Sequence, residues 1–268
     1  MKNAEKTLSE FYNKFGWELK DEITEDARQF EDLRDCASVY LTKCRMRVNE
    51  HIPKKGKYLL DMASGPIQYK EYLSYSENFE KRYCVDMSVD ALNLAKDKIG
   101  NHGEYINDSF FNINFQNNYF DCSISLHTIY HIDKDMQSLA VKKLLDVTKF
   151  GHPVIIVYSN PDTLLNKLMN LKNKLNNRKI KHDNFFKVTN EQEIYFYLHK
   201  LDWWDQFKDR ATVKIYPWRS FLSDTQKKYF PNNILGKLMF HILFKLENIF
   251  PKFFANNFQY VMIVLEKK

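Results

Sequence analysis

Glycine, proline and cysteine are all scarce in this chain of 268 residues, which has seven glycines, seven prolines and four cysteines. Because glycine is so rare, a glycine inside a turn is more informative here than usual. The four cysteines form no C-x-x-C pair and have no spacing to histidine that is typical of a metal site. We therefore expect reduced thiols and no bound metal.

Long apolar runs are missing as well. No uncharged apolar run reaches the length that a membrane span needs. The first residues also lack the apolar core of a signal peptide or an anchor. Both absences predict a cytoplasmic protein.

The net charge of +6 raises the question of nucleic-acid binding. Lysine is spread along the chain, with one denser patch at residues 167–181, and no signature of a nucleic-acid-binding fold accompanies it. A solvated basic face is therefore favoured over a polyanion site, and nucleic acid is not an expected partner.

Apolar segments and helical patterns alternate from residue 57 to residue 158. Strands are expected at 57–62, 82–86, 103–107, 119–126 and 152–158, with helices after Gly65, at 88–99 and at 133–149. Further strands are expected at 193–199, 212–218 and 259–267. This order predicts an α/β fold, with a doubly wound, mostly parallel seven-stranded sheet and an antiparallel last strand.

The regions outside this alternation define the predicted domain organisation. Residues 1–52 read as an N-terminal helical cap, with helical segments around 4–15, 26–34 and 36–51, and residues 53–268 as the main domain. Residues 159–192 contain a helical insertion just past the fifth strand, where it would act as a lid over the ligand crevice. Residues 193–250 would supply elements on the substrate side.

The most informative stretch is 58–68, in which an apolar run ends at Asp61 and passes through Ala63 to a turn at Gly65. In an open α/β sheet, such a strand, turn and helix start is where a nucleotide-type cofactor lies against the backbone. The next strand ends at Asp86, and an acid there can accept hydrogen bonds from both hydroxyls of an adenosine ribose. The G-x-G-x-x-G pattern of a dinucleotide-binding reductase is incomplete, and there is no P-loop.

The succession LLDMASGP, CVDMS, IND, FDCSISLHTIYHI and QYVMIVLE resembles a Rossmann-like (class I) S-adenosylmethionine-dependent methyltransferase. The resemblance covers about residues 57–160 and extends in outline to the last strand. More narrowly, ASGPIQYKEYL and SLHTIYHI resemble a bacterial group often met near surface-polysaccharide genes. The resemblance implies S-adenosyl-L-methionine as cofactor and S-adenosyl-L-homocysteine as product.

The resemblance also implies roles for individual residues. Asp61 would contact the amino group of the methionine moiety, and Asp86 would accept both ribose hydroxyls. Ala63 and Ile67 stand where the family usually has glycine, so Gly65 alone would provide the close backbone approach. The remaining implied contacts are Met87 packing on the adenine, Asp108 and Ser109 at the adenine amino edge, and Leu126 beside the sulfonium.

Histidines are the predicted catalytic residues. A neutral hydroxyl acceptor loses a proton on methylation, and a histidine with a pKa near neutrality suits its removal. His127 is best placed because the fourth strand delivers it to the crevice, with Tyr130 and His131 following. His199 is a further candidate. The structural alternatives are that His127 caps a helix and that His131 packs in the core.

Three further regions each allow two interpretations. Tyr12, Trp17, Arg34 and Tyr40 would close over the methionine end of the cofactor, and Arg34 would pair with the methionine carboxylate. Alternatively, the helix face that carries Arg34 is simply exposed to solvent. Trp203, Trp204, Trp218 and Arg219 would line an acceptor pocket, although aromatics at this spacing are more often core. Segment 233–250 is favoured as a core helix over an interfacial helix or an oligomer contact.

The sequence thus predicts a methyltransferase acting at oxygen on a small molecule or a glycan or nucleotide-sugar precursor, as a monomer or homodimer. One alternative is methylation of an amine, phosphate or phosphoramidate in capsule or surface-polysaccharide decoration. Another is a cofactor-free, methyltransferase-like scaffold that binds a protein partner.

Overall fold

The computed structural model describes residues 16–17, 19–20, 23–168, 185–187 and 193–268. Tyr12, the expected helix at 4–15 and most of the insertion at 162–181 lie outside the described residues. The predictions made for them, including the lid, therefore stay predictions.

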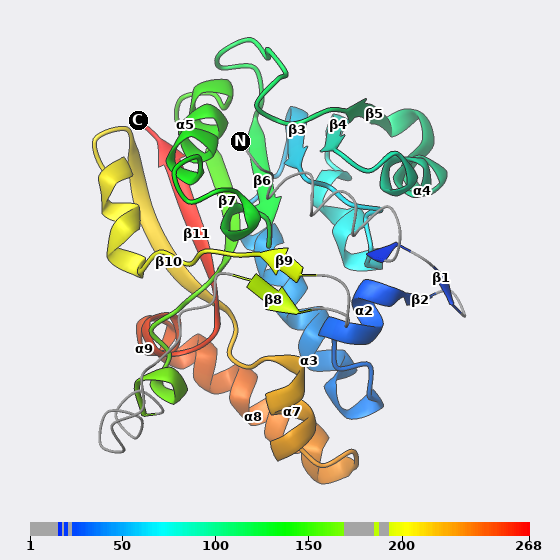
Figure 1. Cartoon of the computed structure of the whole chain (residues 1–268), viewed down its shortest axis with the longest axis vertical. Coiled ribbons are helices and arrows are strands. Elements are labelled where there is room, and N and C mark those ends of the chain that lie inside the picture. The colour runs from blue at the N-terminus through cyan, green and yellow to red at the C-terminus, as the bar shows by residue number, and fades with distance from the viewer. Residues whose placement is uncertain (1–15, 18, 21–22, 169–184, 188–192) are drawn as a thin grey trace.

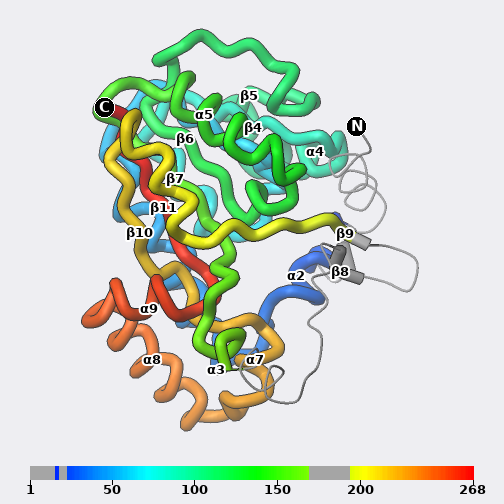
Figure 2. The backbone as a smooth tube through the Cα atoms, turned by 60° about the vertical axis from the view of Figure 1, so that its left-hand side comes forward, coloured from blue at the N-terminus to red at the C-terminus, as the bar shows by residue number. Residues whose placement is uncertain are grey.

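A seven-stranded sheet forms the centre of the molecule, in the order β10-β11-β7-β6-β3-β4-β5. Five strands run parallel: β3 (Gly56–Met62), β4 (Phe79–Asp86), β5 (Gly103–Asn107), β6 (Cys122–Leu126) and β7 (Pro153–Ser159). The last strand, β11 (Tyr260–Lys267), lies antiparallel between β7 and β10 (Ala211–Arg219). Figure 2 shows it in red beside both neighbours. The predicted fold class is confirmed.

Helices flank the sheet and connect its strands (Figure 1). The α-helices are α2 (Glu25–Phe30), α3 (Asp35–Met46), α4 (Val89–Ile99), α5 (Gln137–Val147), α7 (Ser223–Tyr229), α8 (Ile234–Ile249) and α9 (Pro251–Asn257). The 3-10 helices are η2 (Arg47–Glu50), η3 (Lys70–Ser76), η4 (Gly100–His102), η5 (Ile129–His131) and η6 (Leu201–Phe207). Two short antiparallel strand pairs lie outside the main sheet: β1 (Leu19–Lys20) with β2 (Ile23–Thr24), and β8 (Phe185–Lys187) with β9 (Glu193–Tyr195).

The prediction of a regular helix after Gly65 is wrong, because the chain there forms the 3-10 helix η3. Tyr69, Tyr72 and Tyr75 explain the difference, since residues three apart eclipse one another in a 3-10 helix. Their ring centroids lie 5.3 and 5.2 Å apart in succession. The tyrosines thus pack as a row, with Tyr72 and Tyr75 buried.

The segment 193–199 also differs from its prediction as a sheet strand. Only β9 is extended there, and it pairs antiparallel with β8 rather than with the main sheet. The residues that follow this segment form the 3-10 helix η6.

The two faces of the sheet bury separate sets of side chains, as the alternation of a strand requires. In β7, Val154 and Ile156 belong to the core cluster that contains Leu144 of α5, whereas Ile155 and Val157 belong to the cluster on the other face. A third cluster joins α3 to α8, outside the sheet. All four cysteines are free and buried, as expected.

Among the described helices, none is long and apolar enough to cross a membrane.

Candidate cofactor and acceptor site

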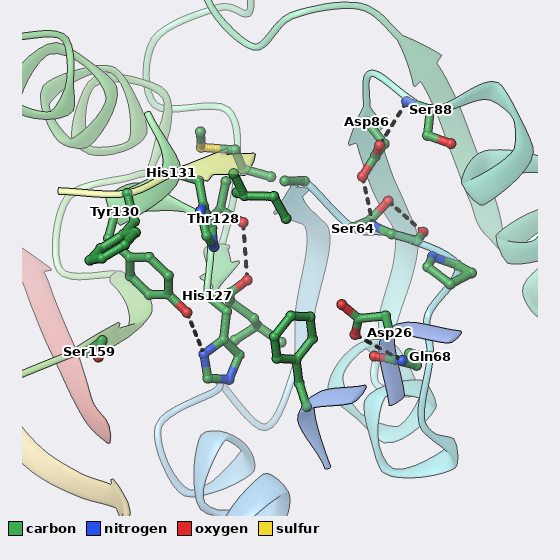
Figure 3. Close-up of a pocket in the computed structure, with 18 of the residues that line it drawn as sticks. Asp26, Ser64, Gln68, Asp86, Ser88, His127, Thr128, Tyr130, His131 and Ser159 are labelled. Carbon is green, nitrogen blue, oxygen red and sulfur yellow. Dashed lines mark hydrogen bonds between the residues drawn. The ribbon is translucent and has the colours of Figure 1, made fainter. Parts of the chain in front are cut away.

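A cavity of about 550 Å³ lies where β3, β4 and β6 end at their carboxyl edge. Figure 3 shows Asp86 and Ser88 on one side of it and His127, Tyr130 and His131 on the other. Its volume is in the range of ligand sites in enzymes. Twelve predicted residues line it: Trp17, Asp61, Ala63, Gly65, Asp86, Met87, Asp108, Leu126, His127, Tyr130, His131 and Arg219.

The turn after β3 has a left-handed backbone at three alternate residues. The φ angles are +56° at Ala63, +54° at Gly65 and +49° at Ile67. A side chain disfavours this conformation, so Ala63 and Ile67 hold it against their own preference. The backbone is thus glycine-like at all three positions, and the close approach of Gly65 to the cofactor stays a prediction. At Gly65 itself, an added Cβ would lie 3.2 Å from the ring of Trp17, which also lines the cavity.

This conformation predicts that Ala63→Gly stabilises the protein. Relief of the left-handed strain is worth about 1–2 kcal/mol, and the extra freedom of glycine in the unfolded chain offsets about 0.5–1 kcal/mol. We expect a gain of about 1 kcal/mol in the free energy of unfolding, measured by urea denaturation. Ala91→Gly, inside α4, is the matched control and should lose about 1 kcal/mol. A loss of stability in both variants would contradict the inferred backbone strain at Ala63.

Asp86 joins the turn to the next helix. Its Oδ2 accepts a hydrogen bond from the Gly65 N–H at 2.8 Å, and its Oδ1 accepts one from the Ser88 N–H at 2.8 Å. Burial raises the pKa of Asp86 to about 6, against the lowering effect of these two N–H groups. Each carboxylate oxygen has a second lone pair, so Asp86 can still accept a hydroxyl at each oxygen. These residues therefore fit an adenosine ribose.

The pKa of about 6 predicts pH-dependent cofactor binding. Only the ionised carboxylate accepts two hydroxyls, so binding favours the charged form and releases a proton below pH 6. The affinity for S-adenosylhomocysteine should be nearly flat from pH 7 to 8 and fall about tenfold from pH 7 to 5. Calorimetry across this pH range checks the prediction. Asp86→Asn is the control, because its amide does not titrate. A flat wild-type profile from pH 5 to 8 would contradict the assignment.

Asp61 lies in a buried ion pair that the sequence did not predict. Arg82 Nε donates to Asp61 Oδ2 at 3.0 Å, and Arg82 Nη2 donates to the same oxygen. Arg82 Nη1 also donates to the Tyr72 carbonyl at 2.6 Å, so η3 is tied to the pair. Oδ1 of Asp61 takes no part in this pair and is the oxygen left for the predicted contact to an amino group. The arginine stands between charged and apolar residues of the strand 79–86, so no local pattern singled it out.

His127 and Tyr130 meet beside the end of β6. The backbone of His127 is left-handed (φ +58°), and its Nδ1 lies 3.2 Å from the Tyr130 hydroxyl. The ring also packs edge-on against Trp218 and Tyr260, with centroids 4.7 and 5.0 Å away. Burial, and next the charge of Arg219, lower the pKa of His127 to about 3. The imidazole is therefore neutral at pH 7.

His131 is also neutral. Its Nδ1 lies 2.9 Å from the Tyr195 carbonyl oxygen, and burial lowers the pKa of His131 to about 4. The expected pKa near neutrality is thus wrong for both histidines. A neutral imidazole still accepts a hydrogen bond and can orient a hydroxyl, although it holds a proton weakly.

Three other predicted site residues lie outside the cavity lining. The His199 ring stacks on Trp203, with centroids 4.4 Å apart, and burial lowers the pKa of His199. Arg34 donates from Nε and Nη2 to Asp32, at 2.7 Å each, and from Nη1 to a backbone carbonyl. Ser109 donates its N–H to Asp108, which does line the cavity.

Buried charges form one wall of the cavity. Arg219 Nη1 lies 2.8 Å from both carboxylate oxygens of Glu31, and Arg45 Nη2 lies 3.3 Å from one of them. Arg219 was predicted to line a pocket and does, whereas Trp203, Trp204 and Trp218 lie outside the lining. Glu31 was not predicted, because its partners are far away in sequence.

Comparison with known proteins finds a similar domain and similar folds. Residues 60–155 match the family model described as a methyltransferase domain. No curated protein matches the chain in sequence. An S-adenosylmethionine-dependent methyltransferase from Archaeoglobus fulgidus is similar in structure, with a TM-score of 0.51 and 16% identity over 85% of this chain and 93% of that one.

Two further structures are similar at the same level. One is DhpI in complex with SAM and HEP, with a TM-score of 0.54, 11% identity and 86% of each chain covered. The other is a protein from Listeria monocytogenes described as an S-adenosylmethionine-dependent methyltransferase, with a TM-score of 0.53, 12% identity and coverage of 84% and 99%. The fold is therefore that of Rossmann-like methyltransferases.

Proposed function

We propose that this protein is an S-adenosylmethionine-dependent methyltransferase that methylates a hydroxyl of a small molecule or a glycan or nucleotide-sugar precursor. The observation that carries the proposal is Asp86, held by the Gly65 and Ser88 N–H groups at the mouth of a left-handed turn. This arrangement presents a carboxylate with free lone pairs to the cavity.

The chain's own residues would divide the work as follows. Asp86 binds the ribose, Oδ1 of Asp61 takes the methionine amino group, and Asp108 faces the adenine edge. The bound cofactor supplies an electrophilic methyl group on a sulfonium. Most of the acceleration would come from holding the acceptor in line with it. His127 and Tyr130 are placed to orient an acceptor hydroxyl and take up its hydrogen bond.

The charges of the cavity favour a neutral acceptor over a phosphate or phosphoramidate. Among the described residues that line it, the carboxyl groups are Asp26, Glu31, Asp61, Asp86, Asp108 and Asp224. The only guanidinium there is Arg219, which is already paired with Glu31. An anionic acceptor would meet net negative charge in a low-dielectric site, which is unfavourable.

A binding and transfer assay tests the proposal. Calorimetry with S-adenosylmethionine should give micromolar binding, and methyl-labelled cofactor should transfer label to a hydroxyl compound within a panel of sugars and nucleotide sugars. Amines and phosphorylated compounds in the same panel distinguish the acceptor classes. No detectable binding heat would overturn the cofactor assignment, whereas transfer only to an amine or phosphate would overturn the acceptor assignment.

A further inference from the structure

The helix α8 has one face buried and another exposed, and both are apolar. Gly236, Phe240 and Leu243 are buried in the cluster with α3 or beside it, so that face is a core face as predicted, although it packs on α3 and not on the sheet as expected. The opposite face carries six exposed aliphatic side chains: Ile234, Leu235, Leu238, Ile242, Leu246 and Ile249. Ile234 is 84% exposed and Ile249 64%.

These six side chains form one continuous stripe. At ~100° per residue they cover an arc of about 120° on the helix. The stripe continues past the end of α8, where Phe250 and Phe253 are 54% and 50% exposed. An apolar patch of this kind on a protein surface marks an interaction site.

The charges that α8 and α9 themselves expose are of one sign. Lys237, Lys245 and Lys252 are exposed on α8 and α9, whereas the single acid of the two helices, Glu247, is fully buried and paired with Arg47. Lys237 pairs with Asp35 at the start of α3. Lys227 and Lys228 of the preceding helix α7 add two more exposed cations.

We propose that α8 and the start of α9 dock on an anionic membrane surface, with the aliphatic stripe entering the interface and the lysines contacting acidic headgroups. An amphipathic helix with an apolar stripe and lysines binds bilayers in this way. Lys245 lies within the stripe, and a lysine there can extend its amine to the headgroups while its stem stays apolar.

A second copy of this chain fits the same face less well. Two stripes packed about a twofold axis would bring the lysines of both copies together, and like charges across an interface are costly. An anionic surface pairs with those charges instead. The inference does not depend on the cofactor.

The docking face is close to the cavity through α7, which supplies Ser223 and Asp224 to the cavity lining and leads into α8. Figures 1 and 2 show α7, α8 and α9 together at the end of the molecule remote from α5. Docking would therefore bring the α7 wall of the cavity near the lipid surface.

Vesicle co-sedimentation tests the proposal. The full chain should pellet with phosphatidylglycerol–phosphatidylcholine vesicles at least tenfold more strongly than with phosphatidylcholine alone, and high salt should weaken it. The double variant Leu238→Glu with Ile242→Glu should lose at least tenfold. Lys245→Glu with Lys252→Glu should lose the preference for anionic lipid. Leu139→Glu, an exposed leucine on α5, is the control and should bind like the wild type.

Unchanged circular dichroism and cofactor affinity would show that the variants fold, which is expected because the replaced side chains are exposed. Absence of wild-type binding to anionic vesicles would overturn the proposal, as would equal binding by the leucine variant. A dimer seen by light scattering, lost in that variant, without vesicle binding would overturn it in favour of a second copy.

Discussion

Asp86→Asn is expected to weaken the binding of S-adenosylhomocysteine about 100-fold. A hydrogen bond to a charged acceptor contributes about 1.5–3 kcal/mol, and two such bonds to the ribose together contribute at least about 3 kcal/mol. That free energy corresponds to about two orders of magnitude in the dissociation constant. The amide keeps the shape of the side chain but has one acceptor oxygen in place of two. Isothermal calorimetry measures the change.

Asp90→Asn is the matched control for this experiment. Asp90 lies in the first turn of α4, four residues from Asp86, and is exposed outside the cavity lining. It should bind the ligand like the wild type. A change of less than threefold in Asp86→Asn, or equal losses in both variants, would contradict the assigned ribose contact.

Arg82→Met is expected to lower the free energy of unfolding by about 3–5 kcal/mol. Its side chain is fully buried and pairs with Asp61, so removing it leaves an uncompensated carboxylate in the core. The variant also removes the donor to the Tyr72 carbonyl. Because an uncompensated Asp61 can escape the cost by taking up a proton, the loss should be smaller at pH 5 than at pH 8. Urea denaturation at both pH values measures it.

Two further variants serve as controls for Arg82→Met. Lys81→Met removes the neighbouring cation, whose pair with Glu104 is exposed, and should change stability by less than about 1 kcal/mol. Asp61→Leu combined with Arg82→Met should recover much of the loss, because no charge then remains unpaired. A loss of less than 1 kcal/mol in Arg82→Met would contradict the buried pair.

The centre of the sheet could be predicted from the sequence because β6, β7 and β11 are buried on both faces. Continuous apolar runs such as 153–159 leave few other structures, and the apolar final strand at 260–267 marked the antiparallel insertion. The 3-10 helix η3 could not be read, since its cause is the packing of three tyrosines against one another. The prediction for segment 193–199 failed for a similar reason, because its strand β9 pairs with the nearby strand β8 and not with the main sheet.

The site was predictable where order along the chain determines it. Asp61 and Asp86 lie at the carboxyl ends of β3 and β4, and Gly65 lies in the turn after β3; parallel strands bring these ends to one edge of the sheet. The Glu31–Arg219 pair joins residues 188 positions apart, and no local pattern predicts it. The pKa values of His127 and His131 depend on burial, which the sequence does not state.

The central claim is that this cavity binds S-adenosylmethionine through Asp86. A crystal structure with S-adenosylhomocysteine tests it most directly. The account predicts both ribose hydroxyls on the Asp86 carboxylate and the amino acid end of the ligand near Oδ1 of Asp61. Density for the ligand elsewhere, or an empty cavity in crystals soaked at millimolar ligand, would contradict it.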